Sequence, residues 1–264
     1  GFGIDCSFIS RNFKQADYVE RQSGLCELAL HNFPLLGLGH IRIHNRDGVS
    51  YLQEMLPVDC LFLDPARRDG HGGKTVAISD CEPDVTVLEP LLVDKAKKVM
   101  VKLSPMLDLS LALNELKTVR AVHIVAVNNE CKELLLILQK ESVSSEVSIH
   151  CEHIVGNGES RHYTFTLKRE KTSPCLLADE VGTYLYEPNA AILKAGAFRS
   201  LTQTYPVAKL HLNSHLYTSV SLVPDFPGRR FRVEAVSGFG KKELKAFLMD
   251  MDKANITIRN FPLS

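Results

Sequence analysis

Short apolar runs alternate with amphipathic segments along the first 140 residues of the chain. Between the runs, apolar residues recur at helical spacing, as at Leu25, Leu28 and Phe33. Strands that alternate with helices in this way predict a mostly parallel sheet with helices on both of its faces. The strands that the runs predict are 16–20, 41–44, 59–64, 98–103 and 121–127.

Two strands near residue 130 are predicted to run in opposite directions. Only the turn Asn128-Asn129 and a few residues separate the apolar run 121–127 from a second one, 133–138. A parallel return would need a long crossover, so these strands must be antiparallel. The first region is therefore predicted to be Rossmann-like α/β, with a mostly parallel sheet and an antiparallel hairpin near one edge. A further strand pair, 147–153 and 162–167, follows the hairpin.

The pattern changes in the charged segment 168–174, which predicts a linker. We expect a first domain at 1–174 and a small α+β module at 175–264. In the module, a helix is expected to begin at Glu187-Pro188 and a final helix at Lys241. The strands expected there are 209–212, 216–223, 230–236 and 256–258.

Composition limits the classes of protein to consider. Lys and Arg equal Asp and Glu at 31 each, so attraction to nucleic acid must come from a local patch. The seven cysteines are scattered without a C-x-x-C pair, which favours reduced thiols in a cytoplasmic protein over disulfides or a zinc site. No apolar run is long enough to cross a bilayer. We expect neither a membrane nor a metal as partner, and the oligomeric state stays open.

The run 59–64 ends abruptly on Asp64 and Pro65. A buried parallel strand of this kind delivers its last side chain to the crevice above the carboxyl ends of the sheet. Asp64 is therefore the leading candidate for a functional residue.

Like Asp64, two other acidic residues stand at the ends of predicted strands, and a glycine turn precedes a predicted helix. Gly1 and Gly3 precede a predicted helix, where bare backbone N–H groups could meet a ligand, although an ordinary turn has the same composition. Glu20 follows at the spacing of a ribose-binding acid, and it could instead be a solvated capping residue. Asp47 ends the next strand, where ligand binding and helix capping are equally good interpretations.

The C-terminal part carries a local excess of positive charge. Between residues 229 and 259, eight basic residues stand against four acidic ones. Arg229, Arg230 and Lys242 are the candidates for phosphate contacts, and a solvated helix face would explain the excess equally well.

Four short motifs follow one another in the first region. They are Gly1-Phe2-Gly3-Ile4-Asp5, Tyr18-Val19-Glu20, Asp64-Pro65-Ala66-Arg67-Arg68 and Lys102-Leu103-Ser104-Pro105. In this order they resemble a bacterial family of class I S-adenosylmethionine-dependent methyltransferases with a C-terminal THUMP-like domain. Two further segments are similar to parts of that appended domain, namely Tyr186-Glu187-Pro188-Asn189 and Ile258-Arg259-Asn260-Phe261-Pro262-Leu263-Ser264.

The resemblance implies S-adenosylmethionine as the cofactor. It implies that Gly1 and Gly3 approach the methionine part of the cofactor, with Asp5 beside them. It further implies that Glu20 binds the ribose hydroxyls and that Asp47 faces the adenine amine.

Asp64-Pro65 resembles the first half of the Asp/Asn-Pro-Pro-aromatic motif of amino-methylating enzymes. In that motif a side-chain oxygen and a backbone carbonyl accept both hydrogens of an amine and aim its lone pair at the methyl group. Ala66-Arg67 replaces the second half, so the ring that would stack on a base is missing. Arg67 or Arg68 could stack a base, clamp a phosphate or form a structural salt bridge. The catalytic candidates are Asp64, Pro65 and Arg67.

We therefore expect a methyltransferase that modifies a base amine in RNA, with the C-terminal module holding the RNA. The alternatives are a methyltransferase of a small molecule or protein, and a non-catalytic nucleic-acid-binding protein that retains the fold. In this fold a central strand precedes the glycine loop, whereas the chain begins at Gly1. We expect the chain to lack that first strand and, by itself, to bind the cofactor poorly.

Overall fold

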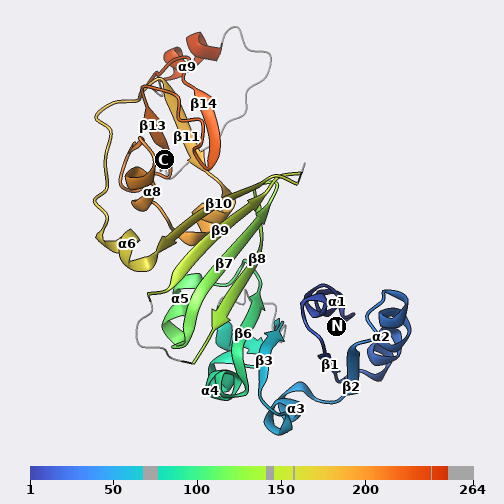
Figure 1. Ribbon diagram of the computed structural model, residues 1–264. Helices are drawn as coiled ribbons and strands as arrows, with labels where there is room; N and C mark the ends of the chain where they lie inside the picture. Colours follow the sequence, from blue (N-terminus) through green and yellow to red (C-terminus); the bar gives the residue numbers. More distant parts are fainter. Residues whose placement is uncertain (68–76, 141–145, 157, 239, 249–264) are drawn as a thin grey trace.

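The computed structural model (Figure 1) describes residues 1–67, 77–140, 146–156, 158–238 and 240–248. The five strands predicted up to residue 127 are all present, as β1, β2, β3, β6 and β7. In chain order the first elements are α1 (Ile4–Ile9), the 3-10 turn η1 (Ser10–Asn12), β1 (Ala16–Glu20), α2 (Ser23–Leu35), β2 (Ile41–Asn45), α3 (Gly48–Glu54), β3 (Val58–Leu63), β4 (Ala66–Arg67), the 3-10 turn η2 (Ile78–Asp80), β5 (Cys81–Glu82), α4 (Val85–Lys95), β6 (Ala96–Leu103), α5 (Leu109–Glu115), β7 (Val119–Val127), β8 (Glu130–Leu138), β9 (Ser148–Ile154) and β10 (Ser160–Thr166).

The large sheet has the strand order β10-β9-β7-β8-β6-β3. Strands β3, β6, β7 and β9 run in one direction, whereas β8 and β10 are reversed. The antiparallel hairpin β7–β8 turns at Asn128 and Asn129, which adopt φ values of 49° and 64°. Asparagine tolerates this left-handed conformation, which a tight hairpin turn requires. The predicted fold class, a mostly parallel sheet with an antiparallel hairpin, is confirmed.

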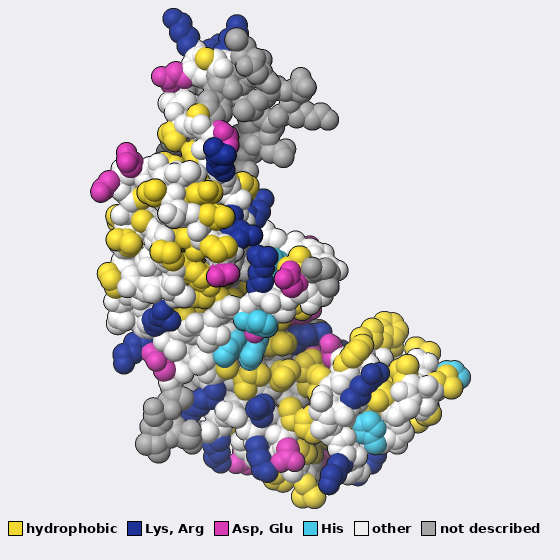
Figure 2. All heavy atoms as spheres, turned by 45° about the horizontal axis from the view of Figure 1, so that its top comes forward, with side chains coloured by type: hydrophobic (Ala, Val, Ile, Leu, Met, Phe, Trp, Pro, Cys, Tyr) yellow, Lys and Arg dark blue, Asp and Glu magenta, His cyan; other side chains and the backbone are white. Residues whose placement is uncertain are grey.

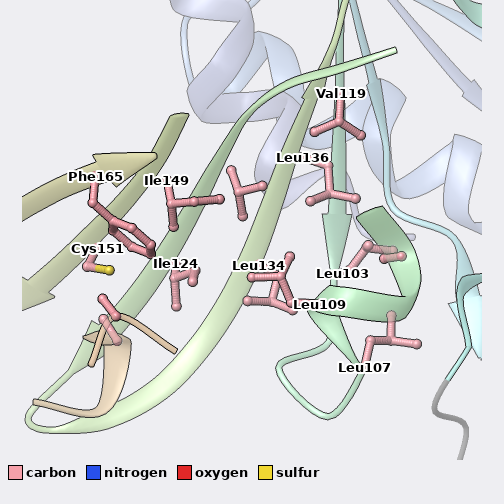
Figure 3. Packing of buried hydrophobic residues seen from close by; sticks show 14 of the residues in the cluster. Leu103, Leu107, Leu109, Val119, Ile124, Leu134, Leu136, Ile149, Cys151 and Phe165 are labelled. Carbon is pink, nitrogen blue, oxygen red and sulfur yellow. The ribbon is translucent and has the colours of Figure 1, made fainter. Parts of the chain in front are cut away.

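One face of the large sheet is buried in the main hydrophobic core (Figure 3). Alternate residues of β7 and β8, such as Ile124, Leu134 and Leu136, are almost fully buried there. Helices α4, α5 and α7 contribute residues to the same core. This alternation is the period of two that a strand with one buried face requires.

The opposite face of β7, β9 and β10 is only partly covered. The rings of His123 and His150 stack on it with centroids 4.6 Å apart, and the side chain of His162 is 62% exposed. Figure 2 shows histidine side chains gathered beside hydrophobic ones on one face of the molecule. Within the described residues, the expectation of helices on both faces of the sheet is therefore not met over these strands.

Strands β1 and β2 form a parallel pair of their own beside the large sheet (Figure 1). Among the described residues, β1 pairs only with β2 and β3 only with β6. The small core under β1 and β2 includes Tyr18 and Phe33, whose rings meet edge to face at 5.4 Å. The N-terminal unit, as we call residues 1–47, therefore has a core separate from that of the large sheet.

The remaining elements follow β10. They are α6 (Leu167–Thr172), β11 (Tyr184–Pro188), α7 (Ala190–Ala195), α8 (Ser200–Thr204), β12 (Ala208–Lys209), β13 (Tyr217–Ser219), β14 (Gly228–Arg232) and α9 (Lys241–Leu248). The four strands form an antiparallel sheet in the order β12-β13-β11-β14. Large buried side chains of this sheet, such as Tyr186 and Tyr217, belong to the same core as the large sheet. The division into 1–174 and 175–264 stays a prediction.

Three sequence predictions in this part need correction. The expected linker 168–174 largely forms helix α6, because the side chain of Thr166 caps it by accepting a hydrogen bond from the Arg169 N–H. Glu187-Pro188 ends strand β11 and does not begin a helix. Helix α7 begins two residues later, where Asn189 accepts a hydrogen bond from the Ile192 N–H. The expected strands are shorter in the structure, and the one at 256–258 lies outside the described residues.

Candidate functional site

The site begins at the carboxyl end of β3, where the apolar strand stops and Asp64 follows. β3 lies parallel to β6, with Leu63 opposite Val101, so Asp64 stands next to Lys102. Pro65 is buried, whereas the Asp64 side chain is 49% exposed. The strand therefore places the Asp64 carboxylate at the rim of the sheet, as the sequence predicted.

Lys102 connects two of the predicted site residues. Its Nζ lies 2.9 Å from Oδ2 of Asp64 and 2.7 Å from Oδ2 of Asp5, at the start of α1. Its side chain is only 19% exposed. Burial by itself would lower the pKa of Lys102, but the hydrogen bonds to Asp5 and Asp64 outweigh it and raise the pKa. Lys102 therefore stays a cation between the N-terminal unit and the large sheet.

A cavity of about 400 Å³ opens beside this cluster. It is lined by the residues after β3, by Cys81 of β5, by the end of β6 with the turn after it, and by the first part of β8: Asp64, Pro65, Ala66, Cys81, Lys102, Leu103, Ser104, Pro105, Leu107, Lys132 and Glu133. Burial raises the pKa of the Glu133 carboxyl, and the negative charges of Asp64 and Asp5 raise it further against the opposing effect of Lys102. No role for Lys102 or Glu133 was predicted from the sequence.

The glycine turn lies on the other side of Asp5. Gly3 has φ +75°, and a Cβ there would lie 2.7 Å from Cζ of Phe33, so both conformation and space require glycine. The Tyr18 hydroxyl donates to the carbonyl of Gly1, and the amino group of Gly1 pairs with Glu20. The structure thus brings the glycine turn and the acid at the end of β1 together.

Glu20 is held by further contacts at its strand end. Its carboxylate also accepts the Gln22 N–H at 2.8 Å. The Gln22 N–H therefore fixes the Glu20 carboxylate as a hydrogen-bond acceptor at the end of β1.

Asp47 caps helix α3. Its Oδ1 accepts the Ser50 backbone N–H at 2.9 Å and the Ser50 hydroxyl at 3.0 Å. These hydrogen bonds lower the pKa of Asp47, which is exposed. The capping interpretation is confirmed, and a contact of Asp47 with adenine stays a prediction.

The chain after Pro65 turns back in a short two-stranded ribbon. Ala66 of β4 pairs with Glu82 of β5, and Arg67 pairs with Cys81. The ribbon places this segment at the mouth of the cavity, which Ala66 and Cys81 both line. Arg68 lies outside the described residues.

Two of the three candidate basic residues in the C-terminal part have partners of their own. Arg229 donates through Nε to Glu187 at 2.8 Å, and the Glu187 side chain is only 6% exposed. Arg230 donates to the carbonyl of Pro224, and Lys242 is exposed on α9. Arg229 and Arg230 belong to β14 of the C-terminal sheet and Lys242 to α9, and none of the three lines the cavity beside Asp64.

Other kinds of site receive no support within the described residues. Every helix there is too short or too polar to cross a membrane. That part of the chain also contains no group of three or more His, Cys, Asp or Glu side chains that could hold a metal ion.

Comparison with known proteins assigns both parts of the chain. A family model described as a ferredoxin-like domain matches residues 184–227, and one described as THUMP domain-like matches residues 228–264. The crystal structure of a "putative methyltransferase from Porphyromonas gingivalis W83" is similar with 35% sequence identity and a TM-score of 0.88. The match covers 100% of this chain and 66% of that one, so this chain spans slightly less than two thirds of its relative.

Weaker similarity extends to two further structures. One is a modification subunit of a "putative type I restriction enzyme from Vibrio vulnificus YJ016", with 11% identity over 67% of this chain and 47% of that chain. The other is a type I restriction-modification system methyltransferase subunit from Streptococcus thermophilus, with 15% identity over 57% of this chain and 45% of that chain. Their TM-scores of 0.37 and 0.34 are too low to define a common fold. No match is found among curated proteins.

Identity, coverage and the two domain matches agree with the fold described above. The α/β part with its strand-end site comes first, and the ferredoxin-like and THUMP-like segments follow it. The chain belongs to the family of class I methyltransferase-fold proteins that carry a ferredoxin-like and a THUMP-like domain at their C-terminal end.

Proposed function

We propose that the chain is the catalytic part of an S-adenosylmethionine-dependent methyltransferase that methylates an amine, with a base in RNA as the acceptor. The observation that carries the proposal is the Asp5–Lys102–Asp64 cluster. It joins the helix after the glycine turn to the carboxylate that would hold the acceptor, at the rim of one cavity.

The residues present fit this cofactor. Glu20 is a carboxylate acceptor at the end of β1, as the ribose hydroxyls require, and Gly3 leaves the backbone bare at the turn into α1. Gly1, Gly3, Asp5, Glu20 and Asp47 are the residues that we expect to hold it. When bound, S-adenosylmethionine supplies an electrophilic methyl group on a sulfonium sulfur.

Asp64 is suited to orient the acceptor amine. Its Oδ2 is occupied by Lys102, which fixes the carboxylate and leaves Oδ1 to accept an N–H of the amine. The carbonyl of Pro65 would accept the second N–H, as in the amino-methylating motif. An amine held in this way presents its lone pair in one direction, and such orientation supplies a large part of a transfer rate.

Two observations bear on the identity of the acceptor. The THUMP-like match at residues 228–264 supports RNA as the acceptor, because the family resemblance implies that a domain of this type holds RNA. The internal contacts of Arg229 and Arg230 favour the alternative, an amine of a small molecule or protein. Arg67 stays a candidate for stacking a base in place of the missing ring.

A radiolabelled methyl-transfer assay tests the proposal. The complete protein would be incubated with S-adenosylmethionine and bulk RNA from cells that lack it, and also with the small-molecule and protein fractions. We expect label in RNA and a loss of about 10²–10⁴-fold in rate for Asp64→Ala. Asp59→Ala is the matched control, since Asp59 is an exposed acid at the other end of β3 that pairs with Lys97.

Two outcomes would contradict the proposal. Transfer that survives Asp64→Ala would remove Asp64 from the reaction. The absence of labelled product from every fraction would favour a non-catalytic protein that retains the fold.

A further inference from the structure

The cavity beside Asp64 contains a second carboxylate, that of Glu133. In the pairing of β8 with β6, Leu135 lies opposite Lys102 and Leu134 opposite Leu103. Glu133 therefore stands just beyond the end of β6, and it lines the cavity together with Asp64 and Lys102. Three neighbouring strands thus bring the carboxylates of Asp64 and Glu133 and the ammonium group of Lys102 to one space, which Lys132 also lines.

Glu133 differs from the other charged residues around it. Asp5 and Asp64 are both held by Lys102, and Lys132 pairs with Glu130. In the part of the chain that the structure describes, the Glu133 carboxylate has neither a hydrogen bond nor an ion pair. It is a partly buried acid that faces a cavity with its oxygens unused.

We infer that Glu133 is the catalytic residue that accepts the proton released by the acceptor nitrogen, an inference that rests on the proposed methyl transfer to an amine. The nitrogen uses its lone pair to form the bond to the methyl carbon, and the electron pair of the carbon–sulfur bond stays on sulfur. As positive charge develops on the nitrogen and the nitrogen becomes tetrahedral, one N–H turns from the Pro65 carbonyl toward Glu133. That proton passes to a carboxylate oxygen of Glu133 during the transfer, and the nitrogen keeps the N–H electron pair, leaving a neutral methylated amine and a neutral Glu133.

The environment of each carboxylate suits a separate task. The Asp64 carboxylate is fixed by the Lys102 ammonium, so it can orient the amine. Burial favours the protonated form of Glu133, and the negative charges of Asp64 and Asp5 act in the same direction against the opposing charge of Lys102. A carboxylate whose pKa is raised toward neutral pH is a better proton acceptor than an ordinary one.

The sign of the expected pH dependence follows from this raised pKa. Glu133 must be ionised to accept a proton, so the rate of single-turnover transfer should rise as the pH increases through the pKa of Glu133. In Glu133→Gln that rise should vanish and the rate should fall by about 10²-fold. Glu133→Asp keeps a base on a shorter side chain and should keep the rise at a reduced rate.

The experiment compares the complete protein with these variants and with Glu130→Gln. Glu130 is an exposed acid at the start of the same strand, so its variant should behave like the wild type. A readout that does not depend on activity is a ¹³C NMR pH titration of protein labelled at the glutamate carboxyl carbons. The resonance that disappears in Glu133→Gln should titrate at a higher pH than the bulk of the glutamates.

The outcomes separate this inference from the proposed function. Transfer by Glu133→Gln with the rate and pH profile of the wild type would overturn the inference alone. A Glu133 resonance that titrates together with exposed glutamates would also overturn it. If the wild-type protein methylates no amine in any fraction, both the proposed function and the inference fail.

Discussion

The rim of the large sheet and the C-terminal four-stranded sheet both carry charged residues, but they use them differently. At the rim, Asp5, Asp64, Lys102 and Glu133 gather beside one cavity, and one ammonium group serves two carboxylates. In the C-terminal sheet, Arg229 neutralises the buried Glu187 of the neighbouring strand. A local excess of charge is therefore a weaker sign of a site than the convergence of charges on a common space.

The topology of each sheet explains this difference. Parallel strands such as β3 and β6 end at the same edge, so the residues that follow them meet there whatever their separation in the sequence. β14 is an antiparallel edge strand, and successive side chains along it point to opposite faces. Arg229 and Arg230 consequently point apart and find separate partners.

Of the substitutions that distinguish the two regions, replacement of Lys102 by methionine should have the largest effect on methyl transfer. It removes the cation between Asp5 and Asp64 and leaves two carboxylates close together, so Asp64 loses its fixed orientation. We expect the rate of methyl transfer to fall by about 10²-fold or more, and S-adenosylmethionine to bind more weakly in calorimetry because Asp5 is also released.

Lys97→Met is the control for this prediction. Lys97 pairs with Asp59 at the opposite end of the same two strands, and both side chains are largely exposed. Its replacement should leave both rate and affinity unchanged. A Lys102→Met protein with wild-type rate and cofactor affinity would show that the convergence of charges has no functional consequence.

Replacement of Arg229 should act on stability and not on transfer. Arg229→Met removes the donor to a carboxylate that is 6% exposed, so we expect a loss of about 1–3 kcal/mol in the free energy of unfolding. Arg230→Met removes an exposed contact to the Pro224 carbonyl and should cost less than about 0.5 kcal/mol. Urea denaturation of both variants measures the difference, and equal losses would contradict a structural role specific to Arg229.

The sequence predicted the part of the site that depends on local pattern. An apolar run that ends in Asp64-Pro65 identifies a buried strand and its rim without knowledge of its neighbours. Glu20 and Gly3 could be found in the same way, from a strand end and a turn. For Asp47 the sequence left two roles open, because an acid that caps a helix and an acid that binds a ligand at a strand end occur in the same sequence pattern.

Lys102 and Glu133 could not be recognised locally. Lys102 lies within a strand as an alternating polar residue, and Glu133 stands at the start of an apolar run, where a solvated position is the ordinary interpretation. Their roles depend on the register that places Leu135 of β8 opposite Lys102, which is a long-range property.

The helix start placed at Glu187-Pro188 was wrong for a related reason. Tertiary pairing with β13 and β14 makes Tyr184–Pro188 a strand, and Asn189 was the true cap signal.

The smallest expected effect concerns RNA binding by the C-terminal part. Arg230 and Lys242 are exposed there, whereas Arg229 is engaged with Glu187. If Arg230 and Lys242 contact phosphates in the complete protein, each replacement by alanine should lower the slope of log affinity against log salt by about one. Fluorescence anisotropy with a labelled RNA at several salt concentrations measures this slope.

Arg232→Ala is the matched control, because Arg232 lies on the same strand as Arg230 and its guanidinium is 3.6 Å from Glu234. Equal slopes in the wild type and all variants would mean that the excess of basic residues is a solvated surface, and RNA would then have to be held by another part of the protein.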